Sequence, residues 1–411
     1  MLERKRGLPL VPEKLDSQPV TDDICVVQNN VVGQDAHTAY TSWVTTPDGT
    51  VVIDPGNFRT CSMINEEIAR ESGKPVRYLI YTHAHMDHIG GAAAFDDHHP
   101  RIIAHENAIP RLERYALTAG YIRRINSIQF HFDIPPGRHS PVYPTETYRD
   151  EYRFELGGRT FELFHGKGET DDHTLVWVPD LKAVFCGDLL EASFPNLGNP
   201  FKVMRYAREW AEALERVLAL DPDFAIGGDV VLVDRARIRE LFKDNIEVLR
   251  FLEDSVVNAA NEGKNLEQMI EDIQLPPHLQ NSPNLRQEYS RREFAIYNIW
   301  KRYCGYFDFS PSGLLPRPGR EIAGVVRELV SSDETVLDKA RELMESGQLQ
   351  LALETLDIIL KVDYEDVPTR HIRQQILKKL AGTDTCMMSR NVWTHYLEED
   401  EAFLAEQTEE G

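Results

Sequence analysis

The most chemically informative stretch of the chain is a run of histidines with one aspartate over residues 82–91. Its sequence, T-H-A-H-M-D-H-I-G-G, supplies imidazoles at His83, His85 and His88 and a carboxylate at Asp87. Two histidines that are two residues apart can point to the same side of an extended segment, while Asp87 and His88 point toward a second position beside it. Imidazole with carboxylate suits zinc, and also iron or manganese. The run therefore predicts two divalent metal ions, for which we expect zinc.

Regular structure on both sides must hold these ligands. An apolar run at residues 77–81 precedes them and predicts a buried strand. Gly90, Gly91 and an alanine-rich stretch follow, so the ligands lie where a strand ends and a helix begins. The alternative is a chance cluster of surface histidines, which the order of strand, ligands and glycine pair disfavours.

A site for two ions needs further ligands from the ends of later strands. His173 comes just before the apolar strand 175–178 and offers a third nitrogen to the first ion. Asp188 follows the next strand, 183–186, and its two oxygens can bridge both ions. A short hairpin between the two strands brings both ligands to one edge of the sheet.

Length and composition limit the classes of protein. A chain of 411 residues is too long for one ordinary domain, and 42% hydrophobic residues are enough for a sizeable core. The formal net charge of -22 argues against nucleic acid or an acidic membrane surface as partner, because both need clustered positive charge. Bound metal ions bring local positive charge, so a small anionic substrate stays compatible with this composition.

The cysteines and the apolar runs bear on the compartment. The five cysteines are odd in number and widely scattered, which is typical of reduced thiols in a cytoplasmic protein. No run approaches the ~20 apolar residues of a membrane span. No apolar segment of signal-peptide length follows the N-terminus. We therefore expect a soluble cytoplasmic protein.

The chain changes character near residue 236. Before it, strand-like runs alternate with helices and turns, which predicts layered α/β architecture. We expect strands at 24–32, 41–45, 50–53, 77–81, 101–105, 160–164, 174–178 and 183–186, a helix at 62–71, and a long loop region over the site at 115–150. After it, helical periodicity dominates, at 238–260, 265–273, 286–303, 321–330, 334–345, 349–362 and 369–380. Ala340 and Leu343 are expected to face Leu356 across a turn at Gly347, as in one tetratricopeptide-like hairpin.

The first half resembles the metallo-β-lactamase superfamily. The resemblance rests on Asp54-Pro55-Gly56, the histidine run, His173 and Asp188, and it covers roughly residues 20–235. It implies an αββα sandwich with two metal ions at one edge of the sheets. The family also ends its ligand set with a histidine, at the position where this chain has Asp229. Either Asp229 ligates the second ion through oxygen or that position is vacant, and we favour ligation.

The helical half is similar to the dimerisation domain of alkyl sulfatases. The similarity rests on the order of four segments, at residues 275–279, 297–300, 303–308 and 314–316, with the helical hairpin after them. It implies a homodimer. Two features depart from that family, which carries glutamates where this chain has His173 and Asp188, and histidines that are not found at residues 191–196.

These observations predict four parts and one reaction class. The parts are an N-terminal extension (1–20), a metallo-β-lactamase-like catalytic domain (21–235), a helical dimerisation domain (236–395) and an acidic tail (396–411). The ligands imply hydrolysis of an ester-like bond in a small molecule (a sulfate ester, carboxylic ester, lactone or thioester) by hydroxide formed at the metal ions. Asp87 is the expected catalytic residue, because it would hold the second ion and orient the hydroxide.

Two other classes of protein compete with this interpretation. An iron-dependent oxidoreductase on the same fold is the alternative, and a non-catalytic protein with a decayed site is the third possibility. Basic residues near the site leave a further choice open, since they either hold an anionic substrate group or simply face solvent. They are Lys202, Arg205 and Arg208 after Asp188, and Arg123, Arg124, His131 and Arg138 in the covering segment.

Overall fold

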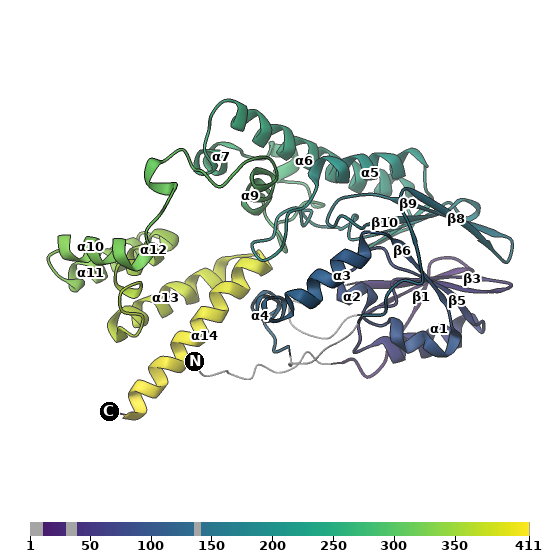
Figure 1. Cartoon of the computed structure of the whole chain (residues 1–411), viewed down its shortest axis with the longest axis horizontal. Helices are drawn as coiled ribbons and strands as arrows, with labels where there is room; N and C mark the ends of the chain where they lie inside the picture. The colour runs from purple at the N-terminus through teal and green to yellow at the C-terminus, as the bar shows by residue number, and fades with distance from the viewer. Residues whose placement is uncertain (1–10, 30–38, 135–140, 411) are drawn as a thin grey trace. The chain divides into compact units, whose positions relative to one another are not determined.

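The computed structural model describes residues 11–29, 39–134 and 141–410, which leaves Arg138 and part of the predicted N-terminal extension outside the described residues (Figure 1). The chain divides into two compact units. The first comprises residues 1–127 and 132–305, and the second comprises residues 128–131 and 306–411.

Two β-sheets form the centre of the first unit. The seven-stranded sheet has the order β1 (Gln18–Pro19), β2 (Ile24–Gln28), β3 (Tyr40–Thr46), β4 (Gly49–Ile53), β5 (Val76–Ile80), β6 (Arg101–His105), β7 (Glu146–Tyr148). The six-stranded sheet has the order β13 (Val231–Leu232), β12 (Phe224–Gly227), β11 (Ala183–Gly187), β10 (Thr174–Val178), β9 (Arg159–His165), β8 (Glu151–Leu156). Strands β4 to β7 pair in parallel, as do β11 and β12, whereas the other neighbours are antiparallel.

The central strands are buried on both faces, so successive side chains enter different cores. In β10, Val176 joins the core between the two sheets, while Trp177 joins the core on the outer face. In β5, Ile80 points between the sheets and Leu79 points outward. This alternation explains why these strands read as continuous apolar runs in the sequence.

Helices complete the layers of the first unit (Figure 1). The outer core of the seven-stranded sheet includes residues of α1 (Cys61–Ser72), η1 (Ala92–His98) and α3 (Ala108–Leu117). The outer core of the six-stranded sheet includes residues of α5 (Ala207–Ala219), α6 (Arg235–Asn261), α7 (Leu266–Asp272), α8 (Pro277–Gln280) and α9 (Arg292–Tyr303). The remaining short elements are α2 (Met86–Ile89) and η2 (Pro179–Leu181). The predicted αββα sandwich, followed by a helical part, is confirmed.

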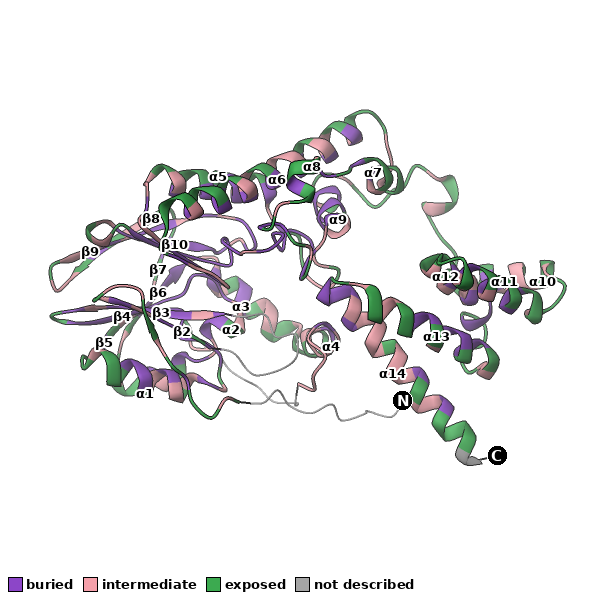
Figure 2. Ribbon diagram, turned by 180° about the vertical axis from the view of Figure 1, so that it is seen from behind, coloured by how far each residue is buried: buried purple, intermediate pink, exposed green. Residues whose placement is uncertain are grey.

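The second unit is helical. Its elements are η3 (Pro311–Gly313), α10 (Gly319–Leu329), α11 (Asp333–Glu345), α12 (Leu349–Leu360), α13 (Val367–Thr383) and α14 (Met387–Glu410). Ala340, Leu343 and Leu356 share one buried core, and Gly347 has a φ of 81° in the turn between α11 and α12. The predicted hairpin is therefore present. Figure 2 shows buried residues on α11 to α13 and more exposed ones toward the end of α14.

Two expectations differ from the structure, and the domain boundaries are compared after them. Much of the predicted loop at 115–150 is helical, because α3 is followed by α4 (Ala119–Gln129), whose Ile125 is buried. Residues 396–410 continue helix α14 instead of forming a separate tail. The compact units divide near residue 305, whereas the predicted domain boundary at 236 coincides with the start of α6. The domain boundaries stay predictions. Among the helices of the described residues, none is long and apolar enough to cross a membrane.

Candidate metal centre

The histidine run follows β5 and continues into α2, as its sequence predicts. Asp54, which follows β4, ties this loop down by accepting hydrogen bonds from the backbone N–H of Thr82 at 2.8 Å and from its hydroxyl at 2.7 Å. A second contact joins Asp54 Oδ2 to His88 Nδ1 at 2.8 Å. Asp54 has a φ of 58°, a left-handed conformation that aspartate tolerates better than most side chains. One carboxylate therefore orients both ends of the metal-binding loop.

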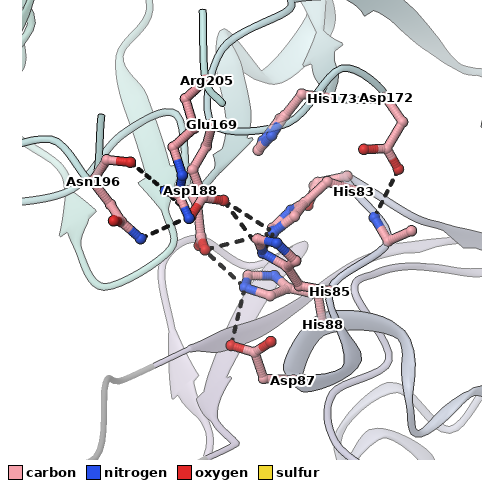
Figure 3. Close-up of polar contacts among 12 residues, drawn as sticks. His83, His85, Asp87, His88, Glu169, Asp172, His173, Asp188, Asn196 and Arg205 are labelled. Carbon is pink, nitrogen blue, oxygen red and sulfur yellow. Dashed lines mark hydrogen bonds and ion pairs between the residues drawn. The ribbon is translucent and has the colours of Figure 1, made fainter. Parts of the chain in front are cut away.

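Four buried or half-buried side chains converge beside this loop (Figure 3). We call them the ligand group: His83, His85, Glu169 and Asp188, whose ligand atoms all lie within 4.8 Å of one another. His83 Nε2 lies 2.7 Å from His85 Nδ1 and 3.5 Å from both Glu169 Oε2 and Asp188 Oδ2. Glu169 Oε2 lies 3.3 Å from His85 Nδ1. Two nitrogens and two oxygens in this space match the donors that zinc prefers.

The tautomer of His83 suits metal binding. The Thr82 hydroxyl donates to Asp54, so it accepts from His83 Nδ1 at 3.0 Å. The proton is thereby assigned to Nδ1, and the lone pair of Nε2 faces the ligand group. Burial, followed by the neighbouring His88 and His85, lowers the pKa of His83 well below its ordinary value. His83 is therefore neutral at physiological pH, as a metal ligand must be.

Glu169 offers one oxygen that no protein group satisfies. Its Oε1 accepts hydrogen bonds from Asn196 Nδ2 and from the Arg205 guanidinium. Its Oε2 is buried without a hydrogen-bond partner and faces the two imidazoles. Burial opposes ionisation of Glu169, but Arg205 and His85 lower its pKa well below the usual range. A buried carboxylate oxygen without a donor is costly unless a cation binds it.

A second group of side chains lies on the other side of Asp188. Its Oδ1 is 3.1 Å from His88 Nε2, whereas its Oδ2 faces His83. Asp87 is half-exposed, and its Oδ2 is 3.8 Å from His88 Nε2. Burial works against a charge on His88, but Asp188, Asp54 and Asp87 outweigh it and raise its pKa well above the ordinary value. The two oxygens of Asp188 thus face different histidines, Oδ2 toward His83 and Oδ1 toward His88.

Four predicted ligands lie outside the ligand group: Asp87 and His88, described above, and His173 and Asp229. The ring of His173 stacks on that of His83 at 4.5 Å, but its Nε2 donates to the Cys186 carbonyl at 3.0 Å. Asp229 Oδ1 accepts from the backbone N–H of Ala192 at 2.9 Å. Metal binding by these residues, as by the other predicted ligands, stays a prediction.

Sequence reasoning missed Glu169, although a local signal was present. Glu169 follows two glycines in the segment Gly166-Lys167-Gly168, directly after β9. A side chain at Gly168 would approach Leu189 Cδ2 to 2.2 Å, so only glycine permits this close approach of the backbone. A glycine pair before a carboxylate at a strand end indicates such an approach.

The basic residues near the site have different partners. Arg205 is buried and pairs with Glu169. Arg208 is partly exposed and lies near Glu253 and Asp254 at 3.6 and 3.4 Å. The Lys202 ammonium contacts Asn126 Oδ1, and burial followed by Arg205 lowers its pKa to about 8. In the covering segment, Arg123 and Arg124 are exposed and His131 pairs with Glu398.

Comparison with known proteins agrees with both parts of the chain. The model of the metallo-beta-lactamase superfamily matches residues 35–229, and the model of alkyl sulfatase dimerisation matches residues 265–402. A linear primary-alkylsulfatase from a Pseudomonas species is 24% identical over 378 residues, covering 84% of this chain and 71% of that protein. An alkyl/aryl-sulfatase of Saccharomyces cerevisiae is 22% identical over 354 residues, 78% of this chain and 54% of its own length.

Two further comparisons are with the solved structure of an alkylsulfatase and with the sequence of a lactamase. The solved structure of an inverting secondary alkylsulfatase from a Pseudomonas species has a TM-score of 0.83 at 19% identity, and covers 94% of this chain and 66% of that one. A type 2 metallo-beta-lactamase of a Bacillus species is 30% identical over 177 residues, 42% of this chain and 58% of that protein. The chain spans only part of the length of each.

The fold, the histidine run and these matches together define the class. Residues 35–229 match the metallo-β-lactamase superfamily, and residues 265–402 match the alkyl sulfatase dimerisation segment that follows the sandwich. The chain is a hydrolase with the metallo-β-lactamase fold. The alternative of an iron-dependent oxidoreductase is not supported, because the named relatives are sulfatases, lactamases and a hydroxyacylglutathione hydrolase.

Proposed function

We propose that the protein is a metal-dependent hydrolase of alkyl sulfate esters. The observation that carries this proposal is the buried ligand group, which presents an unpartnered carboxylate oxygen to two imidazoles. The substrate class is supported by the relatives. Similarity to the primary alkylsulfatase extends over 84% of this chain, whereas similarity to the lactamase covers 42%. Sulfate esters are therefore favoured over the carboxylic esters, lactones and thioesters that the ligands alone leave open.

We assign the first metal ion to His83, His85 and Glu169, with Asp188 between the two ions. Glu169 takes the place that the sequence suggests for His173, since its free oxygen faces the imidazoles. Alkyl sulfatases carry glutamate ligands. With this assignment, a glutamate is also among the ligands of this chain, so the difference from that family is smaller. Asp87 and His88 would hold the second ion, with Asp229 as the remaining candidate.

Divalent ions in such a site supply Lewis acidity and lower the pKa of water toward neutrality. The chain's own residues prepare the site for this chemistry. Neutral His83 and ionised Glu169 are in the protonation states that ligands need, for the reasons given above. Asp87 is the group assigned to orienting the attacking water, because its side chain is 50% exposed beside His88.

Lys202 is the basic residue that we assign to the anionic group of the substrate. Arg205 is committed to Glu169, and Arg208 lies near two carboxylates of its own. The amide oxygen that Lys202 contacts is neutral, so its positive charge stays available to an anion. A substrate with a negatively charged sulfate suits this position.

We further propose a homodimer formed through the dimerisation segment. The second unit exposes large apolar side chains, including Leu315 and Leu329 at 82% and 81%, and Ile322 and Val325 on the same helix as Leu329. Exposed apolar surface of this kind normally marks an interface, and a two-fold arrangement is the commonest solution. Light scattering of the full chain at micromolar concentration should give twice the mass of one chain. The mass of a single chain would contradict the dimer.

A cytoplasmic location is part of the same proposal. All five cysteines are free thiols in the structure, which suits a reducing compartment. Fractionation of the native host cells should recover the activity with cytoplasmic marker enzymes. Recovery with a secreted or periplasmic fraction would contradict this location.

A substrate panel tests the catalytic proposal. The purified protein, loaded with zinc, iron or manganese in turn, is assayed against a linear alkyl sulfate, a matched carboxylic ester, a lactone, a thioester and a β-lactam. We expect the alkyl sulfate to be cleaved at least about tenfold more efficiently, a discrimination of about 1.4 kcal/mol. Preference for any other member of the panel would overturn the proposed substrate class but not the conclusion that the protein is a hydrolase.

A further inference from the structure

Within the first unit, a series of hydrogen bonds connects Glu169 to helix α9. Glu169 Oε1 accepts a hydrogen bond at 3.0 Å from Asn196 Nδ2 and a second from Arg205 Nη1. The same Arg205 nitrogen donates to the backbone carbonyl of Asn196. One guanidinium nitrogen thus holds both the carboxylate and the loop that supports it, which leaves Glu169 Oε2 directed at His83 and His85 (Figure 3).

Arg205 is itself fixed by a single side chain on α9. Its backbone N–H donates to Asn298 Oδ1 at 2.7 Å, and its backbone carbonyl accepts from Asn298 Nδ2 at 3.2 Å. Asn298 is 7% exposed and Arg205 is 3% exposed, so water does not compete for these contacts. The amide satisfies both backbone groups of Arg205, and a shift of α9 would move the guanidinium with it.

Helix α9 is anchored on the segment that leads to Arg205. Its Ile296 and Ile299 lie in the same buried core as Leu190 and Phe194. Gly198 packs so closely on α9 that an added Cβ would lie 1.9 Å from the Phe294 carbonyl oxygen. Just before the helix, the Ser290 hydroxyl donates to the Gly198 carbonyl at 2.8 Å. Packing and hydrogen bonds together make α9 a rigid support for residues 189–205.

This support comes from an unexpected part of the sequence. Helix α9 lies inside residues 265–402, which the alkyl sulfatase dimerisation model matches, yet it belongs to the first compact unit, which ends at Gly305. The matched segment is therefore divided between the two units. Its first part packs around the metal centre.

We propose that Asn298 is a positioning residue of the metal centre, through which helix α9 and Arg205 fix the orientation of the Glu169 carboxylate. The inference rests on the proposed function, in which Glu169 is a ligand of the first ion. Partners that orient a metal ligand typically contribute 10–100-fold to metal affinity. The dimerisation segment thus has a second role, which is to complete the metal site of its own chain.

Metal affinity of the full-length protein tests this role. Competition with a chromophoric chelator gives the affinity for Zn²⁺, and the visible absorption of the Co²⁺ form reports ligand geometry. We expect Asn298→Ala to weaken the first ion about tenfold and to alter the Co²⁺ spectrum. Arg205→Lys keeps the positive charge but cannot reach both acceptors in the same way, so we expect a similar loss. This second variant also covers the case in which Asn298→Ala does not fold.

Asn245→Ala is the matched control. Asn245 is also a buried asparagine of the first unit, and its Nδ2 donates to the Leu241 carbonyl within α6, away from the ligand group. It should lower thermal stability without changing metal affinity. An equal loss of affinity in both asparagine variants would mean general destabilisation and would overturn the proposal.

Glu169→Gln separates this proposal from the one on which it rests. If Glu169→Gln loses the first ion while Asn298→Ala and Arg205→Lys bind it like the wild type, the positioning role is overturned and the ligand assignment stands. If Glu169→Gln itself binds both ions with unchanged affinity, the ligand assignment is wrong and the positioning role falls with it.

Discussion

The two compact units bury charged side chains in opposite ways. In the second unit, Asp400 is fully buried, and Arg370 and Arg373 donate to its oxygens at 3.1 and 2.7 Å. In the first unit, Glu169 has one oxygen held by Arg205 and Asn196, while the other has no hydrogen-bond donor. The first arrangement is complete within the protein, whereas the second leaves one buried carboxylate oxygen facing two imidazoles.

This difference distinguishes a structural cluster from a functional one. Burial of a charge costs free energy unless an opposite charge or hydrogen bonds compensate it. The pair of arginines compensates Asp400, so the cluster can join α13 to α14 without any ligand. The ligand group instead places two imidazoles, His83 and His85, against each other at 2.7 Å between their nitrogens. These two nitrogens are within hydrogen-bond distance of each other, so the group without a partner is the Glu169 oxygen, which a divalent ion would satisfy.

The largest effect is expected from a ligand in the first unit. His83→Ala should remove the first ion and lower turnover by more than the 10–100-fold typical of partners that only orient ligands. The reason is that His83 Nε2 lies within 3.5 Å of a ligand atom of each other member of the ligand group. Metal analysis and turnover of the same preparation measure both effects. Full metal content with full turnover in this variant would show that the site is elsewhere.

Asp400→Ala should affect stability and leave the metal site intact. It leaves two buried guanidinium groups without their partner, which we expect to lower the free energy of unfolding by about 3–5 kcal/mol. Urea denaturation of the metal-free protein measures the change. Asp338→Ala is the control, since its pair with Arg341 is exposed and should contribute no more than about 1 kcal/mol. Similar losses of unfolding free energy in the two variants would show that the buried Asp400 cluster stabilises the protein no more than an exposed ion pair does.

A smaller effect is expected at Asp229. If Asp229 ligates the second ion, Asp229→Ala should lower occupancy of that ion while the first stays bound, and Asp229→His should restore it. Metal stoichiometry by elemental analysis decides between ligation and a structural role, in which Asp229 only accepts from Ala192. Unchanged stoichiometry in the alanine variant would favour the structural role.

The smallest effect concerns Lys202 and pH. Because its pKa is about 8, the ammonium is charged below that pH and loses its charge above it. If it binds the substrate anion, kcat/KM should fall about fourfold between pH 7 and pH 8.5, as the protonated fraction decreases. Lys202→Arg should abolish this alkaline decline, because a guanidinium stays charged over that range. An identical decline in Lys202→Arg would exclude Lys202 as its origin.

Periodicity predicted many of the strands, whereas their arrangement as an αββα sandwich was implied by the family resemblance. Strands β6 and β10 have the predicted bounds, because doubly buried strands leave unambiguous apolar runs. Helices α4 and α14 were missed, since their apolar positions are interspersed with charged and aromatic residues. The division near residue 305 was also missed, because it depends on contacts between α9 and the segment around Gly198, which are distant in sequence.

The candidate site was predicted only as far as local spacing allows. His83, His85 and Asp188 follow strand ends and meet in the ligand group. The glycine pair before Glu169 is a local signal, but the contacts of Glu169 with Asn196 and Arg205 form only in the folded chain. The orientation of His173 toward the Cys186 carbonyl likewise depends on tertiary structure.

Metal stoichiometry coupled to turnover tests the central claim most directly. The metal-free protein is titrated with zinc while hydrolysis of an alkyl sulfate is followed, and the bound metal is measured at each step. We predict two equivalents per chain, with turnover rising as they bind. The account would be contradicted if turnover reached its maximum before any metal was bound. It would also be contradicted if turnover were unchanged after complete removal of the metal.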